Sequence, residues 1–129
     1  MMKNRRKLKK LNDLIELVNN TEKIEWGGGN VIGKTEEGKD ILQWPYPIYP
    51  DGLYESLYEL VELDRDYVDH YEKLGVPIDY DNLTMDEVST VITHYVRGER
   101  FCDGLIAGAI EDGTLLKVLM RLKELYTDL

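Results

Sequence analysis

The sequence predicts an α+β protein that is mostly helical, with about five helices packed with one small β-hairpin. Apolar residues recur at helical spacing in residues 1–21 and through most of residues 51–129. Residues 22–50 break this pattern with a Gly-rich segment and three prolines, which helices do not tolerate. The length of 129 residues fits one domain. We therefore expect a single domain (1–129) made of a basic N-terminal helix, a Gly- and Pro-rich hairpin region and a helical body.

The N-terminal half follows from its local patterns. Residues 4–19 carry apolar side chains at helical spacing and end at a polar run. The short apolar runs at 31–32 and 41–42 flank a Gly-containing turn, which predicts a β-hairpin. Proline fixes φ and lacks an N–H donor, so the Pro- and Tyr-rich segment 45–50 is predicted as an extended connector or an edge strand.

The helical body is predicted to contain four helices, over residues 52–74, 84–98, 100–110 and 114–126. Asp64 interrupts the apolar stripe of the first helix, which leaves open a break near residues 63–66. Thr84 and Glu87 match a capping box, in which each side chain accepts a hydrogen bond from the other residue's backbone N–H. A helix is therefore expected to begin directly after Thr84.

Charge is distributed unevenly along the chain. The formal net charge is −9, yet residues 1–10 contain six basic residues and no acidic one. Residues 51–87 contain twelve acidic residues and only two basic ones. This distribution argues against a simple nucleic-acid coat, which needs a basic face. It leaves residues 3–10 as the one segment suited to weak nucleic-acid contact.

Five acidic residues of the predicted 52–74 helix are spaced so that they share one continuous face. They are Glu55, Glu59, Glu62, Asp66 and Asp69. Such a face can imitate the phosphates of a nucleic acid and occupy a nucleic-acid-binding protein, or it can simply be solvated. The sequence leaves both interpretations open.

The composition favours a cytoplasmic protein with no cofactor. The chain has no apolar run near the ~18 residues of a membrane span and no secretory signal. Its single cysteine, Cys102, cannot form an internal disulfide, and we expect it to be a buried small hydrophobic residue. The two histidines, His70 and His94, are expected at structural or surface positions and not in a metal site.

Residues 28–35 satisfy the phosphate-binding pattern G-x-x-x-x-G-K-[ST] letter for letter. In a true phosphate-binding loop a strand precedes the loop and a helix follows it, so that backbone amides and the lysine surround the phosphates. Here Lys34 is followed by Gly38, a strand-like run and three prolines. We therefore interpret the segment as a Gly-rich entry to the hairpin and not as a nucleotide site.

Two arginines stand out in the acidic body. Thr93, Arg97 and Arg100 recur at helical spacing and are predicted to share a face. Guanidinium groups bind phosphate and carboxylate well, but they can equally pair with acidic neighbours and join two helices. Aromatic residues of the hairpin region could stack on a base or partner, or could cover the core. They are Trp26, Trp44, Tyr46 and Tyr49.

The segment from Thr93 to Gly104 reads Thr-x-x-Val-Arg-x-x-Arg-Phe-x-x-Gly. With the Gly-rich segment at 26–28 and the Pro-Tyr segment at 41–46, it resembles a family of small uncharacterised proteins of bacteria, archaea and phages. That family is catalogued only as a domain of unknown function. The resemblance covers roughly residues 24–125, and the arginine segment is its most specific part. It implies that the two arginines form a meaningful pair and that the protein has a phage association, but it supplies no activity.

Two hypotheses about function follow, and an enzyme ranks below both because no nucleophile–base pair or metal set can be assembled. The first is a non-catalytic protein that binds a partner protein through its acidic surface. In a phage setting it would inhibit a host defence system, with a nucleic-acid-binding host protein as the partner. The alternative is a protein that binds or sequesters a nucleotide or another phosphate. In that case Arg97 and Arg100 would hold the phosphate and an aromatic side chain would stack on the base.

Overall fold

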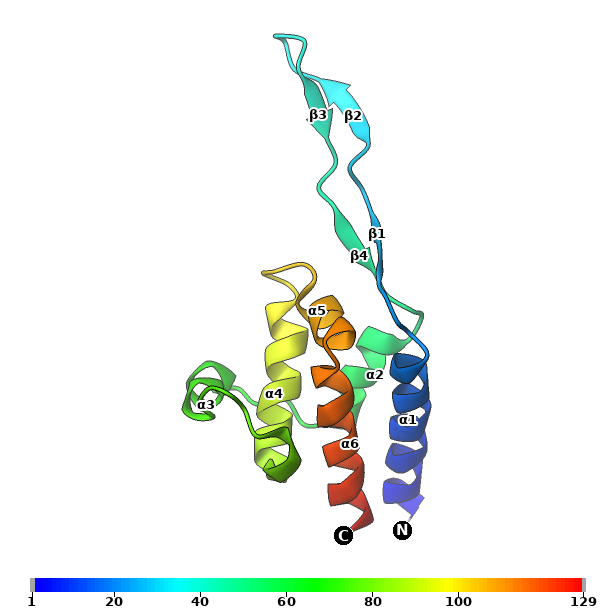
Figure 1. Cartoon of the computed structure of the whole chain (residues 1–129), viewed down its shortest axis with the longest axis vertical. Coiled ribbons are helices and arrows are strands. Elements are labelled where there is room, and N and C mark those ends of the chain that lie inside the picture. The colour runs from blue at the N-terminus through cyan, green and yellow to red at the C-terminus, as the bar shows by residue number, and fades with distance from the viewer. Residues whose placement is uncertain (1, 129) are drawn as a thin grey trace.

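The computed structural model describes residues 2–128, with side chains from residue 5 onward. A helical body carries a long hairpin that projects away from it (Figure 1). The helices are α1 (Met2–Asn19), α2 (Leu53–Leu60), α3 (Tyr67–Lys73), α4 (Met85–Gly98), α5 (Leu105–Glu111) and α6 (Thr114–Thr127), with a 3-10 turn, η1, at Tyr80–Asn82. The mostly helical α+β class predicted from the sequence is confirmed.

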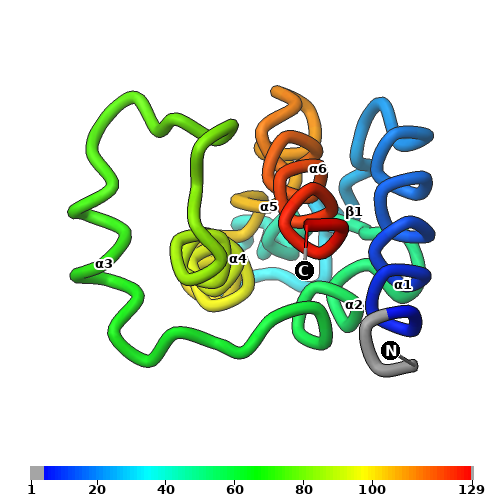
Figure 2. Tube along the Cα trace, turned by 90° about the horizontal axis from the view of Figure 1, so that it is seen from below, coloured from blue at the N-terminus to red at the C-terminus, as the bar shows by residue number. Residues whose placement is uncertain are grey.

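Helix α6 occupies the centre of the helical body, with α1 on one side and α4 and α5 on the other (Figure 2). Its apolar side chains at spacings of three and four are fully buried against the neighbouring helices. They are Leu115, Val118, Leu119 and Leu122. Helix α3 has no buried residue and packs on α4 at the edge of the body, where the Tyr71 ring stacks on His94 with a centroid distance of 3.7 Å.

The capping box at the start of α4 is confirmed. The Thr84 hydroxyl accepts a hydrogen bond from the Glu87 N–H at 3.2 Å, and the Glu87 carboxylate accepts one from the Thr84 N–H at 2.9 Å. Two backbone donors that the helix itself cannot satisfy are thereby paired. Helix α4 consequently begins at Met85, as the sequence predicts, and its buried face includes Val88, Val91 and Ile92.

The predicted helix over residues 52–74 is in fact two helices, so six α-helices replace the expected five among the described residues. Helix α2 ends at Leu60, and Val61 is already extended with φ −138°. The N–H of Asp64 donates to the Thr93 hydroxyl of α4 at 2.9 Å instead of to a carbonyl four residues earlier. A tertiary hydrogen bond therefore replaces the helical one and draws the link between α2 and α3 onto α4.

The hairpin is longer than the sequence predicts because it contains two successive strand pairs. Its strands are β1 (Glu25–Gly27), β2 (Val31–Lys34), β3 (Asp40–Leu42) and β4 (Tyr46–Ile48). Strands β2 and β3 form the predicted pair, and the Pro–Tyr segment forms the edge strand β4 that pairs with β1. Gly28 lies between the two pairs with φ +87°, and a Cβ there would lie 2.4 Å from the Trp44 carbonyl oxygen. Only glycine fits this crossing point.

Candidate functional site

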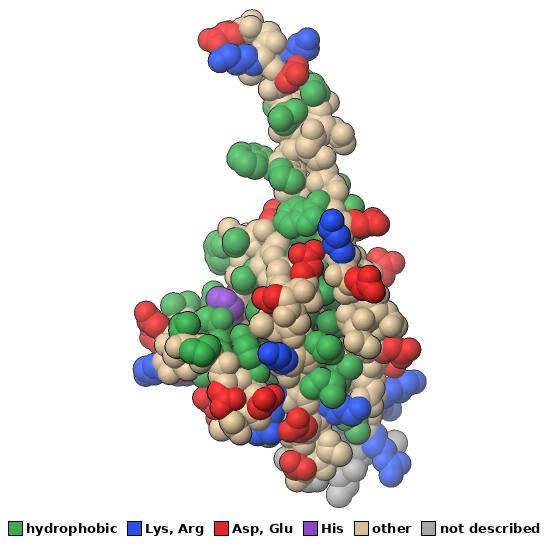
Figure 3. Space-filling view, viewed as in Figure 1, with side chains coloured by type: hydrophobic (Ala, Val, Ile, Leu, Met, Phe, Trp, Pro, Cys, Tyr) green, Lys and Arg blue, Asp and Glu red, His purple; other side chains and the backbone are tan. Residues whose placement is uncertain are grey.

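The hairpin carries most of the exposed apolar surface of the described chain. Eight of the twelve large hydrophobic side chains that are exposed lie on it. They are Trp26, Val31, Ile32, Ile41, Leu42, Trp44, Tyr46 and Ile48. Hydrophobic side chains follow the hairpin upward from the body, and charged side chains gather at its tip (Figure 3). A two-stranded ribbon has no second layer to cover either face, so these side chains remain in contact with water.

The base of the hairpin is fixed to the helical body by Trp26. The Trp26 ring lies against Gly104 in the turn between α4 and α5, where a Cβ would come within 2.7 Å of the ring. On the same strand pair the Tyr46 ring lies against Gly27, where a Cβ would come within 2.6 Å. Trp44, by contrast, is 87% exposed and stands free of the body. The predicted aromatic residues therefore differ in their surroundings, with Trp26 packed against the body and Trp44 exposed on the hairpin.

A second anchor joins the hairpin to the body through Glu99, which is buried at the end of α4. One carboxylate oxygen accepts hydrogen bonds from the Tyr49 hydroxyl at 2.7 Å and the Ile106 N–H at 2.8 Å, and the other accepts one from the Gly104 N–H at 2.8 Å. The Tyr49 oxygen in turn accepts from the Ala107 N–H at 3.0 Å. Burial, together with the Glu99 hydrogen bond, raises the pKa of Tyr49. From the sequence, Glu99 is one of the acidic neighbours with which the arginines could pair. In the structure its carboxylate instead accepts from Tyr49 and from the backbone at the start of α5.

The structure separates the three polar residues predicted to share a face of α4. Thr93 is fully buried, where its hydroxyl donates to the Ser89 carbonyl and accepts from the Asp64 N–H. Arg97 is half-buried, and Arg100 is exposed and donates to the Tyr58 hydroxyl at 3.2 Å. Thr93 is therefore a structural residue, and the two arginines lie in different surroundings.

Arg97 lies beside Arg65 and not beside the hairpin tryptophans. A hollow of about 370 Å³ is lined by Arg65 and Tyr67 from the link after α2 and the start of α3, and by Arg97 and Phe101 from the end of α4 and the turn beyond it. Arg65 could not be found from the sequence, because 32 positions separate it from Arg97 and only the tertiary path of the link brings them together.

The five acidic residues do not form one continuous face. Glu55 and Glu59 lie on α2 and Asp69 on α3, whereas Glu62 and Asp66 lie on the link between them. Figure 2 shows α2 and α3 at separate positions around the body. The continuous face is wrong because the helix that would align these residues is broken. All five remain exposed, and Glu59 pairs with Lys10 of α1.

The basic residues at 3–10 lie on α1, which packs along α6 and α2. The Lys3 side chain lies outside the described side chains. Arg5, Arg6 and Lys9 are exposed, and Lys7 lines a hollow with residues of the α2–α3 link. These side chains form the outer side of an ordinary first helix, one of the two interpretations that the sequence allows.

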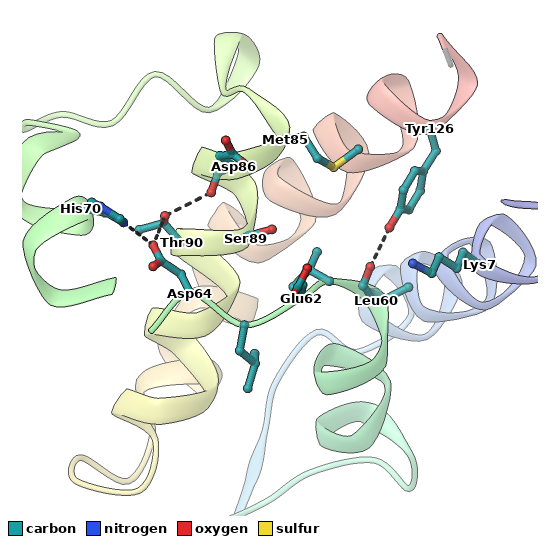
Figure 4. Close-up of a pocket in the computed structure, with 12 residues that line it drawn as sticks. Lys7, Leu60, Glu62, Asp64, His70, Met85, Asp86, Ser89, Thr90 and Tyr126 are labelled. Carbon is teal, nitrogen blue, oxygen red and sulfur yellow. Dashed lines mark hydrogen bonds and ion pairs between the residues drawn. The ribbon is translucent and has the colours of Figure 1, made fainter. Parts of the chain in front are cut away.

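Asp64 organises a polar cluster next to that hollow (Figure 4). Its Oδ2 accepts from the Thr90 hydroxyl at 2.6 Å and lies 2.7 Å from His70 Nδ1, and its Oδ1 accepts from the Asp66 N–H at 2.9 Å. The Thr90 hydrogen bond, and secondarily His70, lower the pKa of Asp64 against the opposing effect of burial. The cluster thus holds the α2–α3 link against α4.

Replacing Thr90 by valine is expected to lower the free energy of unfolding by about 1–2 kcal/mol at pH 7. The depressed pKa of Asp64 stabilises the fold above the unfolded value of 3.8, and this stabilisation is lost as the pH falls through the lower folded value. The wild-type advantage should therefore shrink between pH 7 and pH 3. Urea unfolding at both pH values tests this. Thr21→Val removes an uncharged hydrogen bond to the Leu17 carbonyl, away from Asp64, and serves as a pH-independent control. Equal losses at both pH values for Thr90→Val would contradict the expectation.

The phosphate-binding pattern at residues 28–35 has no helix after it. Lys34 ends strand β2 and is exposed, and a turn from Thr35 to Lys39 leads directly into β3. The interpretation as an entry to the hairpin is confirmed.

Cys102 is exposed in the turn after α4, so its expected burial is wrong. His94 is partly buried beneath Tyr71, which lowers its pKa.

The fold and its surfaces define a small helical body that presents an apolar hairpin. The chain belongs to the family of unknown function DUF6508, whose model matches residues 4–128. The resemblance noted in the sequence is thereby confirmed at the level of a family of unknown function. No curated protein and no solved structure matches the chain. Among residues 2–128, no helix is long and apolar enough to cross a membrane.

Proposed function

We propose that the protein binds a partner protein through its hairpin, residues 25–48. The observation that carries the proposal is the row of eight exposed large hydrophobic side chains on a ribbon that projects from the body (Figure 1). Contiguous apolar surface of this kind marks interaction sites in proteins that are otherwise covered by polar side chains. Trp44 provides the largest exposed ring, and tryptophan is enriched among the residues that contribute most to protein–protein binding.

Charge favours a basic partner over a second copy of this chain. The hairpin carries four acidic residues and two basic ones, and the whole chain has a net charge of −9. Two copies would therefore repel each other, whereas a partner whose apolar patch is bordered by lysine or arginine would be attracted. Glu36 and Glu37 at the tip, and Glu25 at the base, would face such a border. In the phage setting that the family resemblance implies, a nucleic-acid-binding host defence protein fits this description.

The double variant Trp44→Ser, Ile32→Ser is expected to weaken partner binding by about 30-fold or more, since a buried tryptophan anchor is worth roughly 2 kcal/mol. Both side chains are exposed, so the body should unfold at the wild-type midpoint. A photo-crosslinking amino acid at position 44, used in a lysate of the source organism, should yield an adduct with a basic protein. The same amino acid at Lys117, exposed on α6, should not.

Charge reversals separate the hairpin from the acidic residues of the body. Glu36→Lys should weaken the partner complex, and the matched reversal Glu55→Lys on α2 should leave it intact. Loss of binding with Glu55→Lys but not with Trp44→Ser would assign the contact to the body and overturn the hairpin proposal. A crosslink at position 44 that joins only two copies of this chain would overturn the assignment of a basic partner.

A further inference from the structure

A second candidate binding site lies on the helical body, where Arg65 and Arg97 line one hollow. The hollow of about 370 Å³ between α4 and the α2–α3 link is lined by two arginines, two aromatic residues, Leu63 and Asp64. Its size lies at the lower end of the range for small-molecule sites, about 300–1,000 Å³. It does not include any residue of the hairpin, so it is independent of the proposed protein contact.

The position of the two arginines follows from the break between α2 and α3. The hydrogen bond from the Asp64 N–H to the buried Thr93 hydroxyl holds the link against α4. Arg65 is the next residue on the link, and Arg97 lies one helical turn beyond Thr93 on α4. One hydrogen bond between the two segments therefore brings both guanidinium groups to one hollow.

The only carboxylate that lines the hollow is already engaged elsewhere. Asp64 directs its oxygens to Thr90, His70 and the backbone of Asp66. Among residues 5–128, neither Arg65 nor Arg97 forms an ion pair or a side-chain hydrogen bond. Both guanidinium groups are therefore free to donate hydrogen bonds. Their planar, forked arrangement of N–H donors is suited to binding an anion.

Aromatic rings accompany these donors. Phe101, the single phenylalanine of the chain, is 87% exposed in the turn after α4, and Tyr67 begins α3 on the facing segment. An exposed phenylalanine beside unpaired arginines has no role in the core, yet a planar base can stack on such a ring while its phosphate reaches the guanidinium groups. The combination selects ligands that contain both an aromatic ring and an anion.

We propose that this hollow binds a nucleoside monophosphate, with Arg65 and Arg97 on the phosphate and Phe101 and Tyr67 on the base. The small volume favours one phosphate over a triphosphate. The site differs from the one expected from the sequence, because Arg65 replaces Arg100 and Phe101 replaces the hairpin tryptophans.

Titration of the full chain with AMP, inorganic phosphate and adenosine, followed by amide NMR shifts at about 0.15 M salt, tests the proposal. AMP should bind at least tenfold more tightly than inorganic phosphate or adenosine, with shifts around residues 65–67 and 97–101. Arg65→Gln and Arg97→Gln should each weaken AMP binding tenfold or more. Phe101→Ala should lower AMP affinity to that of phosphate. These side chains are exposed or half-buried, and thermal unfolding verifies that each variant is folded.

Arg100→Gln is the matched control, because Arg100 lies one turn beyond Arg97 and contacts Tyr58 outside the hollow. It should leave AMP binding unchanged. Equal affinity for AMP and inorganic phosphate would overturn the assignment to a nucleoside. Absence of saturable binding of all three probes, or equal loss with Arg100→Gln and Arg97→Gln, would overturn the site altogether.

Discussion

Replacing Glu99 by glutamine is expected to lower the free energy of unfolding by about 2–4 kcal/mol. The Glu99 carboxylate accepts hydrogen bonds from the Tyr49 hydroxyl and from the backbone N–H groups of Gly104 and Ile106. A glutamine amide has one oxygen, so its NH2 group must face at least one of these donors. That donor is then buried without an acceptor, and its lost hydration lowers the free energy of unfolding.

Chemical denaturation measures the loss, and Glu72→Gln on the exposed surface of α3 provides the control with the same change of charge. Tyr49→Phe removes one member of the network and should cost about 1–3 kcal/mol by itself. The double variant should lose less than the sum of the two, because the residues share a hydrogen bond. Strict additivity, or a Glu99→Gln protein as stable as the wild type, would show that the carboxylate does not hold the turn.

The Glu99 network has a consequence for the hairpin as well as for stability. Tyr49 follows β4 directly, and its hydroxyl is held by Glu99 and the start of α5. The hairpin has no packed layer of its own, so its orientation on the body depends on this contact and on Trp26. Faster hydrogen exchange in β1 and β4 of the Glu99→Gln protein would report the loosened hairpin separately from global unfolding.

Patterns that depend on neighbouring residues were predictable from the sequence. The start of α4 is set by Thr84 and Glu87, and the strand pair β2–β3 is set by two apolar runs around a turn. The break between α2 and α3 was only partly predictable. Asp64 signalled it, but its extent depends on Thr93, which lies 29 positions away and supplies the hydrogen bond that replaces a helical one.

The candidate sites were less predictable, because both consist of side chains that tertiary packing leaves exposed or without a partner. Val31 and Ile41 are residues typical of half-buried strands, yet both are exposed. The local sequence does not indicate that the hairpin projects from the body without a layer that covers it. The pairing of Arg97 with Arg65 likewise follows from the path of the link and not from spacing along a helix. Local sequence therefore located the hairpin and the arginine segment, and tertiary structure decided which of their side chains are available.

Replacing Gly104 by alanine is expected to cost about 2–4 kcal/mol, from two separate effects. Gly104 has φ +97°, and an L-residue in this left-handed region costs roughly 1–2 kcal/mol. A Cβ there would also lie 2.7 and 2.9 Å from the Trp26 ring, so the ring must leave its place. Gly113→Ala separates the two effects, because Gly113 has φ +84° and no atom within 4 Å of the added Cβ. It should show the backbone cost alone.

A double-mutant cycle with Trp26→Ala then tests whether the contact with Trp26 causes the difference. In the Trp26→Ala background the clash is absent, so Gly104→Ala should cost no more than Gly113→Ala. Urea unfolding followed by circular dichroism gives the energies of all four proteins. In the two that retain Trp26, fluorescence in a Trp44→Phe background follows Trp26 alone, since the chain has two tryptophans. Equal costs for Gly104→Ala in both backgrounds would mean that Trp26 does not anchor the hairpin. In that case Glu99 and Tyr49 would be the attachment that orients the apolar ribbon toward its partner.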